Sequence, residues 1–320
     1  MTLKKILIIR FSSIGDIVLT TPVIRCLKLQ LKDTEIHYLT KRSFKGILEQ
    51  NPHLSKVHVI DKDVNEVIAD LQKENFDHII DLHNNLRSSE VKIKLRKKSS
   101  KFRKLNLQKW LLVNLKINIM PPIHVVDRYL ETVKSLGVIN DQQGLDYFIP
   151  PQDEVDLNAL PLTHQNGFVG FVIGAKHFTK QLPVEKIIAI CRKLNTPVIL
   201  LGGKEDRNRG AEIEKAIGNS IYNACGIYNL NQSASLVKQS IRIITHDTGL
   251  MHIASALKKE IFSVWGNTVT DFGFSPYLPP SGSRIIEVKG LSCRPCSKIG
   301  HDKCPKGHFK CMREIDVDLF

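Results

Sequence analysis

A single carboxylate, Asp16, stands where an apolar run gives way to a helix-like stretch, in "RFSSIGDIVL". The run Ile6–Arg10 is expected to form a buried strand, with the polar loop 11–16 at its carboxyl end. One interpretation of Asp16 is structural, as the N-cap of a helix that begins at Ile17. The other is chemical, because a carboxylate within hydrogen-bond reach of a reacting hydroxyl group can remove its proton.

A second polar loop, "THDTGL", follows an expected strand at 241–245 and precedes an expected helix at 250–257. Free backbone N–H groups and the positive end of the helix dipole make such a helix start an anion site. Gly249 would let a phosphate group approach the backbone, and Thr248 and His252 would add side-chain donors. The structural alternative is a plain N-cap formed by Asp247 or Thr248.

Two further strand ends carry polar residues. In "GAKHFTKQLPVE", a lysine of the loop, Lys176 or Lys180, could neutralise a diphosphate as a point charge, or it could be an ordinary exposed lysine. In "LLGGKEDRN", Glu205 lies just past a strand, where an acid commonly binds a ribose hydroxyl group. The sequence has no G-x-x-x-x-G-K-[ST] motif, and no G-x-G-x-x-G follows its first strand. These absences argue against a kinase, an ATPase or a dehydrogenase.

Four of the seven cysteines gather near the C-terminus with the spacing C-x2-C-x7-C-x6-C. Together with two interleaved histidines, they could close a structural zinc site. The second pair lacks the short spacing of a zinc knuckle, so an ordered loop with reduced thiols is the alternative. The other three cysteines are expected to be small core residues, and no disulfides are expected in a reducing compartment. The clustered residues are Cys293, Cys296, His301, Cys304, His308 and Cys311, and the scattered cysteines are Cys26, Cys191 and Cys225.

The net charge of +14 is concentrated in residues 87–109, which hold ten Lys or Arg and a single acid, Glu90. Such a segment suits an anionic partner: a phosphorylated glycolipid, a membrane surface or a nucleic acid. Interleaved apolar residues such as Leu105 and Trp110 indicate an amphipathic surface for a membrane, and a solvated helix face is the alternative. No recognised nucleic-acid motif accompanies the charge.

The chain shows no sign of a segment that enters a membrane. No apolar run approaches the roughly 18 residues that a spanning helix needs. The start of the chain imitates a signal peptide, but Arg10 ends its apolar run after four residues. A location in the cytoplasm is therefore expected.

Short apolar runs alternate with longer helical patterns in both halves, which is typical of βαβ units and parallel sheets. Prolines at 150, 151 and 161 predict a linker, so we expect two domains, residues 1–155 and 156–320. Two doubly wound domains of this kind would face one another across a cleft and bind ligands there. Expected strands are 6–10, 35–39, 56–60, 78–81, 167–173, 197–201, 241–245 and 260–265. Expected helices are 17–31, 44–50, 64–74, 126–136, 184–194, 212–217, 231–238 and 250–257.

Three stretches together resemble glycosyltransferase family 9, the lipopolysaccharide heptosyltransferases: "RFSSIGDIVLTTPVIRCLK", "THDTGLMHIASAL" and "SVWGNTVTDFGFSPY". The resemblance implies an α/β protein of the GT-B fold, with an acceptor-binding N-terminal and a nucleotide-sugar-binding C-terminal Rossmann-like domain. It implies inverting transfer of a heptose from ADP-heptose to the inner core of lipopolysaccharide, with no metal or other cofactor. The protein would act at the inner face of the inner membrane, reached through residues 87–109, and no nucleic-acid partner is expected.

The resemblance also assigns roles by position. Asp16 matches the family's proposed catalytic base, Lys180 a lysine that contacts the donor diphosphate, and Glu205 the acid that binds the donor ribose. The further donor contacts are Asp247, Thr248, Gly249 and His252, and the acceptor contacts are Ser12, Ser13, Gly15, Arg87 and Arg128.

The chain departs from the family pattern in its basic segment 92–109 and in the glutamine-leucine pair before Pro183. Both departures leave the sugar and the acceptor open. The alternatives are a GT-B transferase or epimerase that uses a UDP- or GDP-sugar, and a basic nucleic-acid-binding protein.

Overall fold

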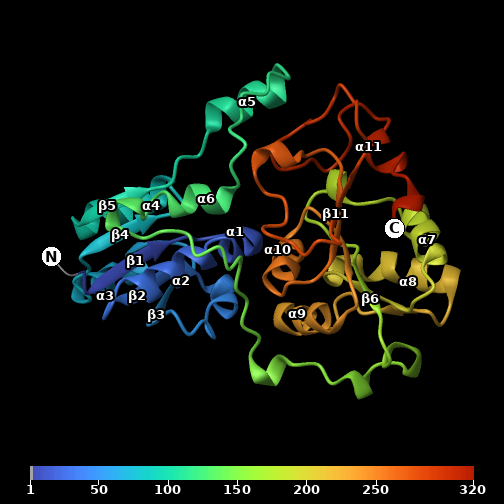
Figure 1. The fold of residues 1–320 in the computed structure, drawn as a ribbon, viewed down its shortest axis with the longest axis horizontal. Coiled ribbons are helices and arrows are strands. Elements are labelled where there is room, and N and C mark those ends of the chain that lie inside the picture. Colours follow the sequence, from blue (N-terminus) through green and yellow to red (C-terminus); the bar gives the residue numbers. More distant parts are fainter. Residues whose placement is uncertain (1–2) are drawn as a thin grey trace. The chain divides into compact units, whose positions relative to one another are not determined.

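The structure is a computed structural model that describes residues 3–320 and divides into two compact units (Figure 1). The N-terminal unit comprises the chain up to Leu105 together with Ile123–Phe148. The C-terminal unit comprises Asn106–Pro122 together with Ile149–Phe320. The sequence pattern placed the boundary at 155/156 and did not predict that residues 106–122 belong with the second unit.

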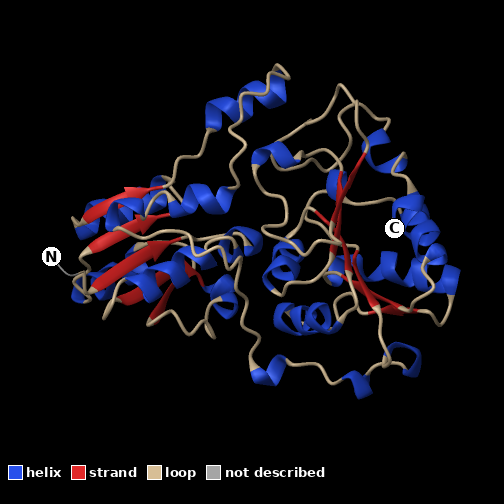
Figure 2. Ribbon diagram, viewed as in Figure 1, coloured by secondary structure: helices blue, strands red, loops and turns tan. Residues whose placement is uncertain are grey.

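A parallel sheet, drawn as red arrows in Figure 2, forms the centre of the N-terminal unit. It has five strands in the order β3-β2-β1-β4-β5. The order reverses at β1, as in doubly wound folds. In register, Ile8 of β1 lies between Tyr38 of β2 and Ile80 of β4. The carboxyl ends of these strands therefore share one edge of the sheet, where the loops of interest begin. The strands are β1 (Lys5–Ile9), β2 (Glu35–Lys41), β3 (Lys56–Ile60), β4 (His78–Asp81) and β5 (Lys98–Lys101).

Five α-helices accompany this sheet in the described chain: α1 (Ile14–Val18), α2 (Thr21–Gln30), α3 (Asn65–Lys73), α4 (Leu86–Leu95) and α6 (Val125–Leu130). The single helix expected at 17–31 is two helices, and the Thr20 hydroxyl between them donates to the Ile17 carbonyl at 2.7 Å. Such side-chain bonding to the backbone competes with helix continuation. The stretch expected as a helix at 44–50 is instead a 3₁₀ turn, Arg42–Ile47.

The basic segment 87–109 is not one continuous element. It runs through α4, then through strand β5 at the edge of the sheet, and into α5 (Asn106–Asn114), which belongs to the C-terminal unit. Helix α4 begins where the Asn85 side chain accepts a hydrogen bond from the Ser88 amide at 2.9 Å. The sequence pattern predicted neither α4 nor β5.

The C-terminal unit holds a six-stranded parallel sheet in the order β11-β10-β9-β6-β7-β8. Its strands are β6 (Val169–Val172), β7 (Val198–Leu201), β8 (Ile221–Asn223), β9 (Ile243–His246), β10 (Ile261–Trp265) and β11 (Arg284–Glu287). Its other helices are α7 (Val184–Lys193), α8 (Arg207–Ile217), α9 (Leu230–Gln239), α10 (Gly249–Ala256) and α11 (Lys310–Arg313).

Alternate residues of β6 supply the two apolar cores of this unit. Phe171 packs in the cluster that contains Leu200, whereas Val172 packs in the cluster that contains Ile199. Successive side chains of a strand point to opposite faces, so both faces of the sheet are covered and its polar groups collect at the strand ends. Among residues 3–320, no helix is both long enough and apolar enough to span a membrane.

Candidate functional site

Asp16 is the third residue of α1, the helix that follows the carboxyl end of β1. Its Oδ1 atom is 2.6 Å from Nη2 of Arg10, and its Oδ2 atom accepts hydrogen bonds from the Ser13 hydroxyl at 2.8 Å and the Ser13 amide at 3.2 Å. Ser13 is the residue that precedes the helix, so the interpretation of Asp16 as the N-cap of a helix starting at Ile17 is wrong. Asp16 instead lies in the first turn of the helix and accepts hydrogen bonds from the N-cap residue, Ser13.

The electrostatic surroundings keep Asp16 ionised. Burial by itself would raise the pKa of this carboxyl group, but the Arg10 guanidinium and the Ser13 hydrogen bonds outweigh that effect and lower the pKa below its usual range. The side chain retains 23% of its accessible surface, so a reacting group can still reach it. The site therefore presents a fixed and accessible, though weakly basic, carboxylate.

Arg10 and His83 also lie at this edge, and neither was predicted from the sequence. Arg10 donates from Nε to the Ser12 carbonyl at 2.8 Å and from Nη1 to the Leu82 carbonyl at 2.7 Å, which joins the loops after β1 and β4. Burial, with a further contribution from Arg10, lowers the pKa of His83 to about 4, so its imidazole is neutral at pH 7. In the sequence, the sign of a role for Arg10 is its position as a charged residue directly after the apolar run 6–9.

The predicted acceptor contacts lie in different surroundings. Gly15 lies within α1 and is not among the described glycines with positive φ, so its backbone conformation is one that other residues also adopt. Arg87 is exposed in the first turn of α4. Arg128 is only 5% exposed, with its guanidinium 5.3 Å from the centre of the Phe102 ring, and this burial disfavours a direct acceptor contact.

In the C-terminal unit, the ends of β6 and β9 bring Lys180 to Asp247. Lys180 closes the 3₁₀ turn Phe178–Lys180, and its ammonium group lies 2.5 Å from the Asp247 carboxylate. The Thr268 hydroxyl, from the loop after β10, donates to the same carboxylate oxygen at 2.9 Å. Lys180 is thus a positioned cation at the carboxyl edge of the sheet, and it is not an ordinary exposed lysine.

Helix α10 begins directly beside this pair. Thr248 precedes its first residue, Gly249, and occupies the N-cap position that the structural alternative expected for Asp247 or Thr248. Its side chain makes no capping hydrogen bond to the helix. The amide N–H groups of the first turn remain available to an anion. His252, one turn into the helix, is buried.

The end of β7 holds two adjacent acids with different surroundings. Glu205 is exposed, as a ribose-binding acid would have to be. Asp206, which was not predicted from the sequence, is buried and accepts a hydrogen bond from the Gly203 amide at 3.0 Å. A Cβ atom on Gly174 would lie 2.1 Å from the Asp206 carboxylate, and one on Gly202 would lie 2.8 Å from it. These glycines make room for Asp206 between the ends of β6 and β7.

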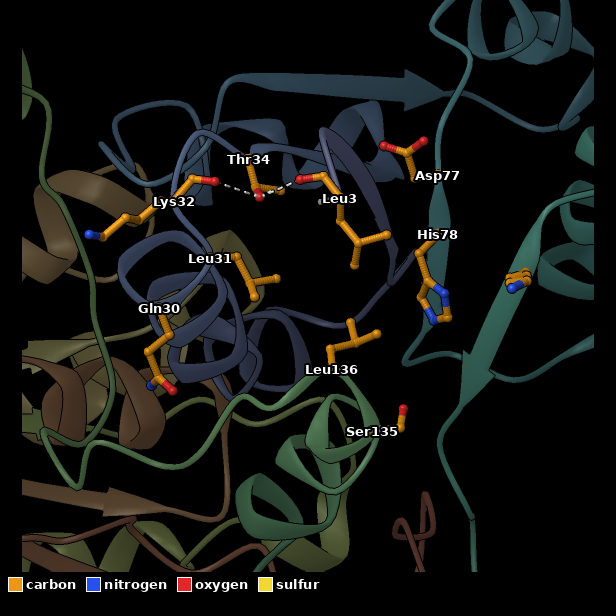
Figure 3. A pocket seen from close by; sticks show the side chains of 10 residues that line it. Leu3, Gln30, Leu31, Lys32, Thr34, Asp77, His78, Ser135 and Leu136 are labelled. Atoms are coloured by element: carbon orange, nitrogen blue, oxygen red, sulfur yellow. Dashed lines mark hydrogen bonds between the residues drawn. The ribbon is translucent and has the colours of Figure 1, made fainter. Parts of the chain in front are cut away.

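Two other features of the N-terminal unit do not join either cluster. A cavity of about 530 Å³ is lined by residues at the amino ends of strands, including Asp77, His78 and Lys98 (Figure 3). Asp16 lies at the opposite, carboxyl edge of the same sheet. We therefore assign this cavity no part in the chemistry.

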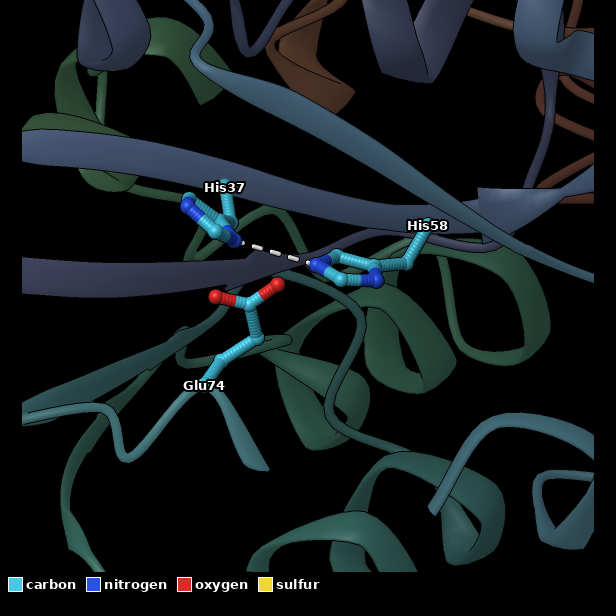
Figure 4. A group of neighbouring side chains, drawn as sticks. All are labelled: His37, His58 and Glu74. Atoms are coloured by element: carbon cyan, nitrogen blue, oxygen red, sulfur yellow. Dashed lines mark hydrogen bonds between the residues drawn. The ribbon is translucent and has the colours of Figure 1, made fainter. Parts of the chain in front are cut away.

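The second feature is a group formed by His37, His58 and Glu74, whose ligand atoms lie within 4.8 Å of one another (Figure 4). The two ring nitrogens that face each other, at 3.0 Å, already share a hydrogen bond. The carboxylate is bound by Lys5 at 3.0 Å and by Lys56 at 2.7 Å. Because the two imidazoles bond to each other and the carboxylate binds two lysines, we assign this group a structural role.

Comparison with known proteins identifies the family. The family model for glycosyltransferase family 9 (heptosyltransferase) matches residues 64–305. The chain belongs to glycosyltransferase family 9. A lipopolysaccharide heptosyltransferase 1 of Campylobacter coli is 26% identical over 82% of this chain and 84% of its own. A lipooligosaccharide heptosyltransferase 2 of Haemophilus influenzae is 24% identical over 92% of each chain.

Solved structures support the fold. A family 9 glycosyltransferase from Veillonella parvula superposes with a TM-score of 0.80 and 21% identity, over 99% of this chain and 94% of that chain. The ADP-heptose lipopolysaccharide heptosyltransferase II of Escherichia coli superposes with a TM-score of 0.71 and 20% identity, over 98% of each chain. The predicted family, the GT-B fold and the assignment as a glycosyltransferase are therefore confirmed.

Proposed function

We propose that this glycosyltransferase moves a heptose, or a related sugar, from ADP-heptose to the inner core of lipopolysaccharide with inversion at the anomeric carbon. The observation that carries the proposal is the Asp16 carboxylate, held ionised by Arg10 and Ser13 at the carboxyl end of β1. The sugar, the nucleotide and the acceptor class are those of the related heptosyltransferases.

In this mechanism, Asp16 removes the proton from an acceptor hydroxyl group while that oxygen attacks the anomeric carbon. The new glycosidic C–O bond forms as the bond from that carbon to the diphosphate breaks, and ADP leaves with the electron pair. Because the pKa of Asp16 is depressed, the carboxylate is a weak base, and the proton moves late, once the attacking oxygen has become acidic. One carboxylate suffices for a single displacement.

Lys180 and the start of α10 would stabilise the leaving diphosphate. The ammonium group of Lys180 supplies a full charge, oriented by Asp247, and the amides before and after Gly249 add partial charges. Thr248 adds a hydroxyl donor, and Glu205 would bind the donor ribose. These groups provide the positive charge that a divalent cation supplies in other transferases, so we propose a metal-independent transfer.

The domain roles follow from this division of labour. The N-terminal unit would bind the acceptor through Ser12, Ser13, Gly15 and Arg87, and the C-terminal unit would bind the nucleotide sugar. The mechanism requires both units to act on the same donor–acceptor pair. Arg128 and His252 are buried, and we give them a supporting role next to these contacts.

We also propose that the protein works in the cytoplasm at the inner face of the inner membrane. Residues 87–109 would bind anionic lipid through their Lys and Arg side chains, and Leu107 and Trp110 of α5 are 66% and 53% exposed. No nucleic acid takes part in this proposal.

A donor screen with purified protein and core lipid lacking its heptose tests the activity. A mass gain of one heptose with ADP-heptose is expected, and its absence would retain the family but reject the named reaction. Thermal-shift titration with ADP, UDP and GDP tests the alternative donors, because a bound nucleotide raises the melting temperature. Stabilisation by UDP or GDP in place of ADP would favour a different nucleotide sugar.

A further inference from the structure

The segment 106–122 packs with the C-terminal unit, although the chain enters it from the last strand of the N-terminal sheet. It consists of α5 and eight further residues that form neither helix nor strand. The sequence gave no sign of this exchange between the two units. The segment takes no part in the two clusters described above, so its own chemistry is open.

Polar contacts fix this segment to loops of the C-terminal unit. The side-chain amide of Asn118 donates to the Asp271 carboxylate at 2.5 Å, and the ammonium group of Lys116 donates to the Pro295 carbonyl at 2.7 Å. Of the side chains in α5, that of Leu112 is buried. The segment is therefore held in place by its polar groups and by one side of its helix.

The apolar side chains of the same segment mostly face solvent. Five large ones, within thirteen residues, each have at least 50% of their surface exposed: Leu107, Trp110, Leu115, Ile117 and Ile119. Leu107 and Trp110 are three residues apart and so share one face of α5, away from the side that holds Leu112. A single exposed apolar residue is common on a protein surface, but a continuous run of them marks an interaction site.

The charge around this run indicates what covers it. Residues 91–126 contain ten Lys or Arg and no Asp or Glu. The covering surface must therefore be apolar and anionic at the same time. A bilayer that contains anionic phospholipid meets both conditions, because its phosphate groups lie directly above its acyl chains. Tryptophan also prefers this boundary, where its ring is buried and its N–H group stays near water.

We propose that Leu107, Trp110, Leu115, Ile117 and Ile119 insert into an anionic bilayer and form a monotopic anchor that belongs to the C-terminal unit. The anchor rests on the proposed location at the inner membrane and deepens it, since the basic segment 87–109 supplies attraction and residues 107–119 supply insertion. Helix α5 has nine residues, too few to span a bilayer. It lies in the plane of the interface instead, with its apolar face about 5–10 Å deep.

The contacts of the segment determine which part of the enzyme is anchored. Asp271, which binds Asn118, lies in the loop after β10 that also carries Thr268. The Thr268 hydroxyl donates to the carboxylate of Asp247 in the proposed donor site. The anchor is thus joined to the unit that would hold the nucleotide sugar, and not to the unit that would hold the acceptor.

Tryptophan fluorescence of the full-length protein measures insertion directly. The chain has two tryptophans, and Trp265 is only 1% exposed, so a change caused by vesicles reports Trp110. Vesicles of phosphatidylcholine and phosphatidylglycerol should shift its emission to shorter wavelength. Bromine atoms on the upper part of the acyl chains should quench it more than bromine atoms near the chain ends. Trp110→Phe should lose both signals and still bind, because phenylalanine keeps an apolar ring.

Leu107→Gln and Trp110→Gln should each weaken partition into these vesicles about 10-fold, because an apolar side chain no longer leaves water. The loss should persist at high salt, which screens charge attraction but not apolar insertion. Leu162→Gln and Ile241→Gln are matched controls, since both change an exposed apolar residue of the same unit outside this segment. Both controls should partition like the wild type.

Vesicle-bound protein whose Trp110 is not quenched would show attraction by charge alone and would overturn the insertion. Equal losses in the variants and the matched controls would also overturn it. So would self-association of lipid-free protein that Trp110→Gln abolishes, because the apolar run would then be covered by a second copy. None of these measurements involves sugar transfer. A failed donor screen would therefore reject the proposed reaction and leave the anchor standing, whereas unquenched Trp110 would reject the anchor and leave the reaction.

Discussion

The guanidinium of Arg10 lies 2.6 Å from the carboxylate of Asp16 and is itself fixed by the carbonyls of Ser12 and Leu82. The residue that holds the proposed base therefore also weakens it as a base. Arg10 fixes the position of the Asp16 carboxylate and keeps it ionised, and it thereby lowers the affinity of that carboxylate for a proton. This relationship leads to measurable consequences for rate and for stability.

Arg10→Met should move the acidic limb of the kcat/KM profile to higher pH, by about one to three pH units, because removing an adjacent cation raises the pKa of a carboxyl group. Arg10→Lys, which keeps the positive charge but not the planar guanidinium group, should shift this limb less. The measurement is a pH–rate profile of the three proteins. An unmoved limb in Arg10→Met would contradict the positioning role.

The same pair should contribute to folding in a defined pH range. The pKa of Asp16 is lower in the folded state, so its stabilisation is complete above the unfolded value of about 3.9 and is lost as the pH falls through the folded value. Urea unfolding across acidic pH should show a steeper loss of unfolding free energy for the wild type than for Asp16→Asn. Parallel curves would show that Asp16 is not coupled to folding.

Asp16→Asn should lower kcat by about 100- to 10,000-fold, the usual contribution of a general base, while donor binding is retained. The amide keeps the size of the side chain but cannot accept the proton. Turnover and ADP titration would be measured together, with Asp70→Asn, an exposed change on α3, as the control. Turnover at the wild-type level would reject Asp16 as the base.

Lys180→Gln should reduce kcat/KM for the donor by about 100-fold, because a charge aimed at the leaving diphosphate is lost and Asp247 is left without its cationic partner beside it. Lys176→Gln removes an exposed lysine from the same loop and should have little effect. Steady-state kinetics with varied donor tests the pair. Equal losses in both variants would point to a general effect of charge in this loop.

Gly174→Ala should lower the free energy of unfolding by about 1–3 kcal/mol, because its Cβ atom would meet the Asp206 carboxylate at 2.1 Å. Truncation of that carboxylate removes the clash. The double variant Gly174→Ala/Asp206→Ala should therefore lose less than the sum of the two single changes in urea unfolding. Strict additivity would show that the two residues do not interfere.

Replacing Arg96, Lys101 and Arg103 by glutamine should weaken binding to anionic vesicles on the order of 100-fold, at about 1 kcal/mol per basic residue. Glutamine changes at Lys32, Lys62 and Lys215, which are exposed outside this segment, are the matched control. Vesicle flotation at several salt concentrations provides the measurement. Binding that depends on neither salt nor this segment would reject it as the lipid contact.

Much of the fold followed from apolar periodicity. The strands around Ile8 and Phe171 are buried runs with unambiguous patterns, and their order along the chain was predicted correctly. Strand β5 was missed because "KSSK" has no apolar side chain at all, and β8 because it spans only three residues. Such strands exist through pairing with a neighbour that the local sequence does not reveal.

The site was predicted in part. Asp16, Lys180, Thr248 and Gly249 lie at strand ends and helix starts, where the pattern placed them. Arg10 and Asp206 were missed because their roles depend on partners brought in by tertiary structure: Leu82 for Arg10, and Gly174 for Asp206. Local pattern locates a loop, but it does not show which side chains the neighbouring loops hold in place.

Strand β5 has a consequence for handling the protein. It is the outer strand of its sheet, and its free edge presents unpaired backbone groups onto which another polypeptide could add. Lys98 and Lys101 oppose such edge-to-edge association through their charge and hydration. Variants that replace these two lysines with leucine or valine should therefore aggregate through this edge, whereas hydrophilic substitutions should keep the protein in solution.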